Sequence, residues 1–356
     1  MERFLSAPSK LFLTGEYAVL WGGTARIAAV PPRGDAYVRR RDDREVHLVL
    51  EEGRVRGYCT PRGVNWSQAV PKTFSFACHA LDEVLRAHGR EALGFEVALS
   101  SPTLRGEKKL GLGGSARAAV LASEAARYVL DERFDALKLA LLAHAQGQAS
   151  LGSGADVAAI FAGGLIRYRR YPVEPLLQAS RSGELAAALD GSPPVDLWRL
   201  PAPRLHLAYA FSGASASTTR LIEDAEARLR PEDREGFVLK SDQLGELAEK
   251  AILSGNFPAL GEALEELHDH LKTLGPLETD AIARIVAIAR SYGCAAKMSG
   301  AGGGDGCVLC APDDEVRSAM LEGLNSRGFW AVPLSLEAGL RGELEGDRQL
   351  RQWLDG

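Results

Sequence analysis

The order of strands and helices along the chain sets the strongest limit on its fold. Up to about residue 100, β-branched and apolar residues predict strands, among them "KLFLTGEYAVL" and "ARIAAVPP", which form a pair around a glycine turn. One helix at about 73–88 interrupts them. From residue 115 the stretches "SARAAVLASEAARYVLD" and "ALKLALLAHAQGQ" repeat apolar residues at helical spacing. Strands first and helices later favour an α+β fold over a doubly wound sheet.

The second half of the chain adds strands and helices of the same kinds. "RLHLAYAFSG" and "FWAVPLSL" predict strands, and "CAAKMSGAGGGDGCVLCAP" predicts a strand, a glycine loop and a strand. We expect helices at about 216–229, 233–255, 257–272, 277–291 and 314–327, and a short amphipathic tail. A chain of 356 residues exceeds a comfortable single core, so two lobes are expected. The polar, proline-containing stretch at 173–203 predicts either an insertion or their connection, with lobes at 1–185 and 186–356.

Charge and hydropathy argue against several classes of function. The formal net charge is -5 and positive and negative residues are mixed, so no nucleic-acid partner is expected. The cluster "RRRDDR" at 39–44 is broken by acids and predicts a solvated strand end. No apolar run reaches the length of a membrane span, and the first twenty residues lack the apolar core of a secretion signal. We therefore expect a cytoplasmic protein without membrane contact.

Cysteines and histidines give no sign of a metal or disulfide framework. Five cysteines are few for a chain of this length. Cys307 and Cys310 form a C-x-x-C around Val and Leu, which favours a buried strand over zinc or redox chemistry. His268 and His270 are two residues apart on an expected helix and diverge, so we expect both on its surface.

The stretch "KKLGLGGSARAAV" at 108–120 places three glycines and a serine directly before a helix. A helix start has unpaired N–H groups and a partial positive charge, and glycines let a backbone approach an anion closely. The stretch matches neither the G-x-x-x-x-G-K-[ST] P-loop nor the G-x-G-x-x-G dinucleotide pattern. Two interpretations stay open: a phosphate-binding loop, or an ordinary turn in which Ser115 caps the helix.

Three other features favour a ligand. "SGAGGGDG" at 299–306 holds five glycines in eight residues, an entropic cost that a simple hairpin turn rarely needs. Asp156 follows two glycines at the start of an apolar helix, where it either caps the helix or faces a substrate. Lys10 enters an apolar strand, either as an edge charge or as the cation beside a triphosphate.

In this order, these segments resemble the motifs of the GHMP kinase superfamily, which includes galactokinase, homoserine kinase, mevalonate kinase and phosphomevalonate kinase. "APSKLFLTGEYAVL" is similar to the first motif, "GEKKLGLGGSARAAV" to the second, P-x-x-x-G-L-G-S-S-A, and "KMSGAGGGDGCVLC" to the third, so that the resemblance covers nearly the whole chain. Within the superfamily, "GEYAVL", "AQGQASLGSGADVAAIFAGGLIRY" and "SGAGGGD" most resemble the phosphomevalonate kinases. Mevalonate kinases more often show P-S-G-x-D-N where this chain has "GSGADVA".

The resemblance implies an N-terminal lobe like ribosomal protein S5, a C-terminal ferredoxin-like lobe, ATP and Mg²⁺ as cofactors, and phosphomevalonate as the small-molecule substrate converted to diphosphomevalonate in isoprenoid biosynthesis. Lys10 would neutralise charge on the transferred phosphoryl group, Asp156 would orient or deprotonate the accepting oxygen, and Ser115 would contact Mg²⁺. The implied ATP contacts are Lys109, Gly111, Leu112, Gly113, Gly114, Ser115 and Ala116. The implied substrate contacts are Glu16, Tyr17, Ser153, Gly154, Ser215, Ser217, Ser299, Gly300, Ala301 and Gly302.

The chain departs from the family pattern at two positions. The paired serines become Gly114 and Ser115, and Arg117 stands where alanine is common, so that it either faces solvent or reaches a phosphate. A phosphorylated acceptor also requires cations, and the candidates are Lys72, Arg105, Lys108, Lys109, Arg117 and Arg220. The hydroxyls of Ser215, Ser217 and Thr218 either bind that phosphate or only cap a helix.

Alternative functions stay open at this point. Within the fold they are a mevalonate kinase, another GHMP small-molecule kinase, or a decarboxylase that phosphorylates first. Outside catalysis, the alternative is a relative that binds a nucleotide or metabolite, against which Lys10, Ser115 and Asp156 argue. A monomer and a homodimer are both compatible with the sequence.

Overall fold

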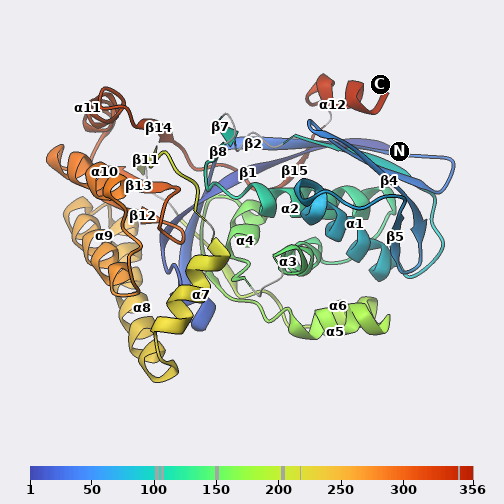
Figure 1. Cartoon of the computed structure of the whole chain (residues 1–356), viewed down its shortest axis with the longest axis horizontal. Helices are drawn as coiled ribbons and strands as arrows, with labels where there is room; N and C mark the ends of the chain where they lie inside the picture. Colours follow the sequence, from blue (N-terminus) through green and yellow to red (C-terminus); the bar gives the residue numbers. More distant parts are fainter. Residues whose placement is uncertain are drawn as a thin grey trace.

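The structure, a computed structural model, describes residues 1–100, 104–105, 108–148, 152–201, 205–216, 218–343 and 345–355. Two separate sheets, each with its own helices, lie side by side as two lobes (Figure 1). The predicted two-lobed α+β fold is confirmed, because antiparallel pairing dominates both sheets and helices pack against each.

The first lobe is built on a nine-stranded sheet. Its strands are β1 (Glu2–Thr14), β2 (Thr24–Arg40), β3 (Glu45–Leu50), β4 (Gly53–Thr60), β5 (Gly63–Trp66), β6 (Phe95–Leu99), β9 (Leu165–Arg169), β10 (Leu197–Leu200) and β15 (Arg341–Glu343). The order is β10-β9-β2-β6-β3-β4-β5, and β1 pairs with both β2 and β15. A short 3₁₀ helix, η1 (Ala18–Trp21), joins β1 to β2. Lys10 lies within the long β1–β2 pairing, and Glu16 follows the end of β1.

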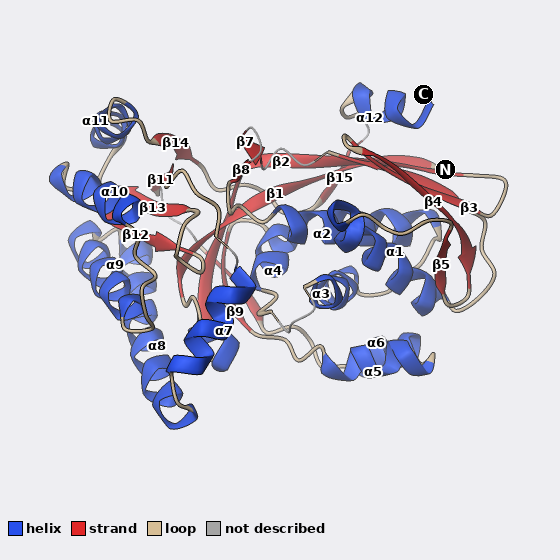
Figure 2. Cartoon of the chain, in the orientation of Figure 1, coloured by secondary structure: helices blue, strands red, loops and turns tan. Residues whose placement is uncertain are grey.

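Helices cover both faces of this sheet (Figure 2). On one face lie η2 (Lys72–Phe74), α1 (Ser75–His88), α2 (Gly114–Val129), α3 (Ala136–Gly147) and α4 (Ala155–Ala162), followed outward by α5 (Glu174–Ser182) and α6 (Leu185–Gly191). Their alanines and leucines form one core with the strands. On the other face, α12 (Arg348–Asp355) buries Leu350 and Leu354 against Phe4 and Tyr37. The hairpin β7 (Leu104–Arg105) and β8 (Lys108–Lys109) precedes α2.

The second lobe is built on a four-stranded antiparallel sheet in the order β12-β13-β11-β14. The strands are β11 (His206–Phe211), β12 (Ala295–Ser299), β13 (Gly306–Ala311) and β14 (Trp330–Leu334). The helices are α7 (Thr218–Arg228), α8 (Pro231–Ser254), α9 (Phe257–Lys272), α10 (Asp280–Ser291) and α11 (Asp314–Asn325). Cys307 and Cys310 are buried in β13, which confirms the prediction of a buried strand.

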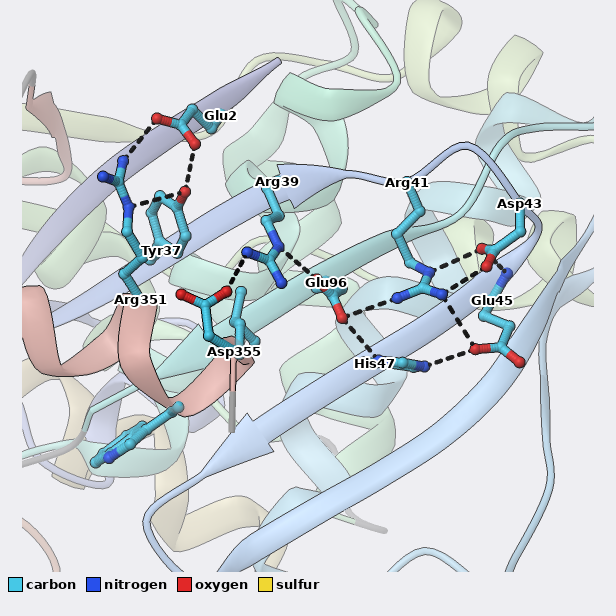
Figure 3. A network of polar contacts seen from close by, with 12 residues as sticks. Glu2, Tyr37, Arg39, Arg41, Asp43, Glu45, His47, Glu96, Arg351 and Asp355 are labelled. Atoms are coloured by element: carbon cyan, nitrogen blue, oxygen red, sulfur yellow. Dashed lines mark hydrogen bonds and ion pairs between the residues drawn. The ribbon is translucent and has the colours of Figure 1, made fainter.

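The cluster at 39–44 is more than the solvated strand end that the sequence predicts. Figure 3 shows Arg39 and Arg41 on either side of the Glu96 carboxylate, whose side chain is only 4 % exposed. His47 Nδ1 lies 2.8 Å from the same carboxylate, and Asp355 of α12 pairs with Arg39 at 2.6 Å. β2 ends at Arg40 and residues 42–44 are exposed, so the predicted solvated strand end is confirmed. The ion pairs could not be predicted, because the partners Glu96 and Asp355 come from distant parts of the chain.

His268 and His270 are buried in α9, and the predicted surface position is wrong. The helix is packed between α8 and β12, so its buried face is wide enough for residues that diverge by two positions. Met298 N donates to His268 Nδ1 at 3.2 Å, and His270 Nε2 donates to Phe237 O at 3.0 Å.

The stretch at 173–203, predicted as a polar insertion or connection, contains α5, α6 and β10. Leu176, Leu185 and Leu189 are buried and suffice to dock these short helices, while the polar residues face outward. The elements β10, β15 and α12 follow residue 185 in the sequence but pack in the first lobe. The position of the boundary between the lobes stays a prediction. Among the described residues, no helix combines the length and apolar character that crossing a membrane requires.

Candidate functional site

The first glycine loop leads into α2 through residues with left-handed backbone. Gly111 has φ 69° and Gly113, the N-cap residue, has φ 86°, a conformation that favours glycine. The helix begins at Gly114, so Ser115 lies in the first turn and the predicted serine cap is wrong. The N–H groups of this turn have no acceptor within the helix and carry the positive end of its dipole. The loop therefore has the backbone chemistry of an anion site.

Lys10 lies directly against this loop. Its Nζ donates to Gly111 O at 2.9 Å, and its backbone N donates to Leu112 O at 3.1 Å. A Cβ on Gly113 would come within 2.9 Å of Lys10 Cγ. β1 thus brings a cation to the N-terminal end of α2.

Asp156 and Ser115 meet across a residue that the sequence analysis missed. Gly154, with φ 73°, caps α4, and Asp156 stands in its first turn. Asp156 Oδ2 lies 3.7 Å from His144 Nε2, and Ser115 Oγ lies 3.3 Å from the same nitrogen. Burial lowers the pKa of His144, Asp156 opposes the shift and Lys10 adds to it. A histidine inside the apolar stretch "LLAHAQ" was the available signal, because a polar residue at a helical core position needs partners.

The second glycine loop touches the first. Tyr209 of β11 donates to Leu110 O at 2.6 Å, and a Cβ on Gly111 would lie 2.6 Å from the carboxylate carbon of Asp305. Asp305 has φ 49° and accepts from Ala216 N at 3.2 Å. The first glycine loop, from the first lobe, therefore lies against the second glycine loop, from the second lobe, and the second loop contacts the turn at 212–216.

Two models of one protein family match this chain. Residues 75–164 match the GHMP kinases N terminal domain, and residues 248–328 match the GHMP kinases C terminal model. The chain belongs to the GHMP kinase family. These enzymes are ATP-dependent phosphotransferases, which agrees with a cation and an anion-binding helix start at one place.

Relatives of this GHMP kinase cover almost its whole length. The phosphomevalonate kinase of Streptomyces sp. (strain CL190) is 28% identical, over 94% of this chain and 97% of that protein. The mevalonate kinase of Thermococcus gammatolerans is 26% identical, over 88% of this chain and 91% of that protein. The structure of Streptococcus pneumoniae phosphomevalonate kinase with phosphomevalonate and AMPPNP has a TM-score of 0.80 at 18% identity, covering 94% of this chain and 99% of that one.

Several predicted substrate contacts of the GHMP kinase join the two lobes. Lys297 of β12, fully buried, pairs with Glu16 at 2.5 Å, and Ser299 Oγ donates to Phe12 O at 3.0 Å. Tyr17, with φ 61°, donates to Ala301 O at 2.7 Å. Burial, followed by the charge of Glu16, raises the pKa of Tyr17, so its hydroxyl stays protonated. Their role as substrate contacts stays a prediction, and their present partners lie in the opposite lobe.

Arg117 corrects one expectation for the GHMP kinase. Its side chain does not face solvent, because it is fully buried and donates to Ser9 Oγ at 2.8 Å and Pro32 O at 3.0 Å. One turn into α2, position 117 faces β1 and β2, so the guanidinium acts inside the first lobe. Its pKa falls to about 10 chiefly through burial.

The other predicted contacts are distributed unevenly. Ser153 Oγ accepts from Ala155 N at 3.2 Å beside Asp156, whereas Lys72 and Arg220 lie on exposed surface. A Cβ on Gly302 would lie 2.9 Å from Leu277 Cβ, so this glycine of the second loop is closely packed. Ser217 and the side chains of Arg105, Lys108, Lys109 and Thr218 lie outside the described residues.

The site fits a nucleotide phosphate better than a free metal ion. The left-handed glycines, the start of α2 and Lys10 supply anion donors. Within the described parts of the chain, no group of three or more His, Cys, Asp or Glu could hold a metal. Mg²⁺ is commonly held by substrate phosphates and waters together with one or two protein side chains, and the Ser115 hydroxyl in the first turn of α2 would be such a side chain.

Proposed function

We propose that this GHMP kinase is a phosphomevalonate kinase, which transfers the γ-phosphoryl group of ATP to the phosphate of phosphomevalonate and forms diphosphomevalonate in the mevalonate route. The observation that carries the phosphotransfer is the gathering of Lys10, Ser115 and Asp156 at the start of α2. The choice of acceptor is supported by the "GSGADVA" and "SGAGGGD" motifs and by the Streptomyces relative. We also propose that it works in the cytoplasm, as a monomer or homodimer.

Each residue has a role that follows from position and charge. The first turn of α2 and its glycines hold the ATP phosphates, and Lys10 neutralises charge on the transferred group. Bound Mg²⁺, with Ser115 as a ligand, supplies further charge neutralisation. Because the second pKa of a phosphate monoester is about 6, the acceptor is mostly a dianion at neutral pH and needs no base. Asp156 therefore orients the acceptor, whereas an alcohol acceptor would require it to take a proton.

The experiment compares kcat/KM for phosphomevalonate and mevalonate at fixed Mg²⁺ and salt, and the rate is measured as the release of ADP. A site that binds the acceptor phosphate leaves polar groups unpaired with mevalonate, so we expect discrimination of up to about 10⁴-fold in favour of phosphomevalonate. Equal or higher efficiency with mevalonate would overturn the acceptor and leave the phosphotransferase chemistry in place.

The second candidate is a mevalonate kinase, which the Thermococcus relative supports at 26% identity. Against it stands the sequence "GSGADVA", where mevalonate kinases more often carry P-S-G-x-D-N. If neither acceptor leads to ADP release, the protein is another small-molecule kinase, a decarboxylase or a non-catalytic nucleotide-binding relative. ATP binding without turnover identifies the non-catalytic relative.

A further inference from the structure

His144 is a buried side chain of α3 that lies behind the starts of two other helices. Its side chain is 2 % exposed, and Phe76 of α1 packs beside the imidazole with ring centroids 5.2 Å apart. A ring enclosed in this way does not reach a ligand itself. Any effect on phosphoryl transfer must pass through the side chains that it contacts.

Both side chains that face His144 Nε2 belong to the proposed catalytic group. Ser115, 3.3 Å away, stands in the first turn of α2, and Asp156, 3.7 Å away, stands in the first turn of α4. α3 packs against both helices, so the backbone that carries His144 is fixed relative to them. One nitrogen thus lies between the proposed Mg²⁺ ligand and the proposed acceptor-orienting carboxylate.

The surroundings favour one form of the ring. A neutral imidazole carries hydrogen on one nitrogen only. A lone pair on Nε2 would be repelled by the Asp156 carboxylate, whereas an Nε2–H is attracted to both oxygens. The geometry therefore favours a hydrogen on Nε2.

We propose that His144 is a positioning residue, which holds the Ser115 hydroxyl and the Asp156 carboxylate at a fixed separation by donating from Nε2. The inference rests on the proposed function, because Ser115 and Asp156 have their roles only if that function is correct. It adds a residue outside the three glycine-containing motifs. Side chains that orient a metal ligand are typically worth about 10- to 100-fold in metal affinity or activity.

The test compares His144→Phe, which keeps an aromatic ring beside Phe76 and removes the donor, with His144→Gln, whose amide nitrogen takes the place of Nε2. Calorimetry measures ATP affinity with and without Mg²⁺. For His144→Phe we expect metal-free affinity within about twofold of wild type, and a loss of about 10- to 100-fold in the enhancement by Mg²⁺ and in kcat. His144→Gln should recover most of both, and the acceptor KM should change little in either variant.

Phe76→Leu is the matched control, because it disturbs the packing around the ring without touching Ser115 or Asp156. It should lower the unfolding midpoint and leave the Mg²⁺ enhancement intact. Should His144→Phe not fold, His144→Met gives the same comparison with a smaller donor-free side chain.

Wild-type enhancement and kcat in the donor-free variant would overturn the proposal, as would an equal loss in Phe76→Leu. A wild-type protein whose ATP binding does not respond to Mg²⁺ would contradict the proposed function instead. The two failures are thus distinguishable by the wild-type titration alone.

Discussion

Asp156 lies with its carboxylate toward His144 and is 19 % exposed, so its charge faces the site. Asp156→Asn keeps the shape and removes the charge that orients the acceptor. We expect kcat to fall by about 10²-fold with the fold intact, because the acceptor is no longer held in line. Steady-state ADP release measures the change, and circular dichroism checks the fold.

Asp269→Asn is the control for this change, because Asp269 is exposed and pairs only locally with Lys272. It should turn over at the wild-type rate. Near-normal turnover in a folded Asp156→Asn protein would contradict the proposed role of the carboxylate.

Single residues differ in how far the sequence revealed them. Lys10 and Asp156 could be found because each stands in a recognisable motif beside glycines. Lys297 could not, since its partner Glu16 is distant in sequence and only the tertiary fold brings the two close. His144 was marked only as a polar residue at a helical core position, and its contacts with Ser115 and Asp156 follow from the tertiary fold. The solvent-facing alternative for Arg117 is wrong, because the direction of its side chain depends on which face of α2 packs on β1 and β2.

At the scale of elements, the first glycine loop depends on close approach between β1, α2 and α4. Gly113 has φ 86°, and a Cβ there would lie 2.9 Å from Lys10 Cγ and 3.2 Å from Ile160 Cδ1. Gly113→Val adds a branched side chain in a strained conformation and displaces Lys10. We expect no ATP binding detectable by calorimetry, whereas Ser115→Ala should mainly weaken Mg²⁺-dependent turnover.

Gly236→Val is the matched control, since Gly236 lies on the exposed face of α8 and a Cβ there meets nothing within 4 Å. ATP affinity should be unchanged in this variant. If Gly113→Val also binds ATP normally, the stretch is only a turn.

Long periodic elements were predictable from the sequence and short ones were not. α2, α8 and α9 repeat apolar residues over several turns, so their helical period is visible. β15 is the three-residue sequence "RGE", which pairs with β1 and is too short to show a side-chain pattern. α5 and α6 were not predicted, because a few buried leucines within a polar stretch suffice to dock short helices.

At the scale of the whole molecule, the two lobes are joined by a buried ion pair. Glu16 from the end of β1 and Lys297 from β12 are both almost fully buried, and Arg26 of β2 pairs with Glu249 of α8 at 2.9 Å. Lys297→Met leaves the Glu16 carboxylate buried opposite an apolar side chain. We expect the free energy of unfolding to fall by about 3–5 kcal/mol, measured by urea denaturation.

The double variant Glu16→Gln/Lys297→Met removes both charges and should recover most of that loss. A double variant as unstable as Lys297→Met would show that packing, rather than an unpaired charge, causes the effect. Wild-type stability in Lys297→Met would show that the pair does not hold the lobes together.

The buried histidines of α9 give the folded protein a dependence on pH. Burial lowers the pKa of His268, with Glu278 opposing and Lys297 and Arg290 adding to the shift. Burial also lowers the pKa of His270, with the carbonyl of Phe237 opposing and Lys240 adding to the shift. The unfolded chain therefore binds protons near pH 6.5 that the folded chain resists, and stability is lost as the pH falls through this value.

We expect the free energy of unfolding, from urea denaturation, to decrease between pH 7.5 and 6, by up to about 1.4 kcal/mol per pH unit for each such histidine. The window stops at pH 6 because burial raises the pKa of Asp82 to about 6, and protonation of that carboxyl stabilises the folded state at lower pH. His268→Gln/His270→Gln should flatten the dependence, since glutamine keeps polar atoms but takes up no proton. A slope as steep as that of the wild type would place its origin outside α9, in other groups such as the half-buried His79 and the buried His144, whose pKa values burial also lowers.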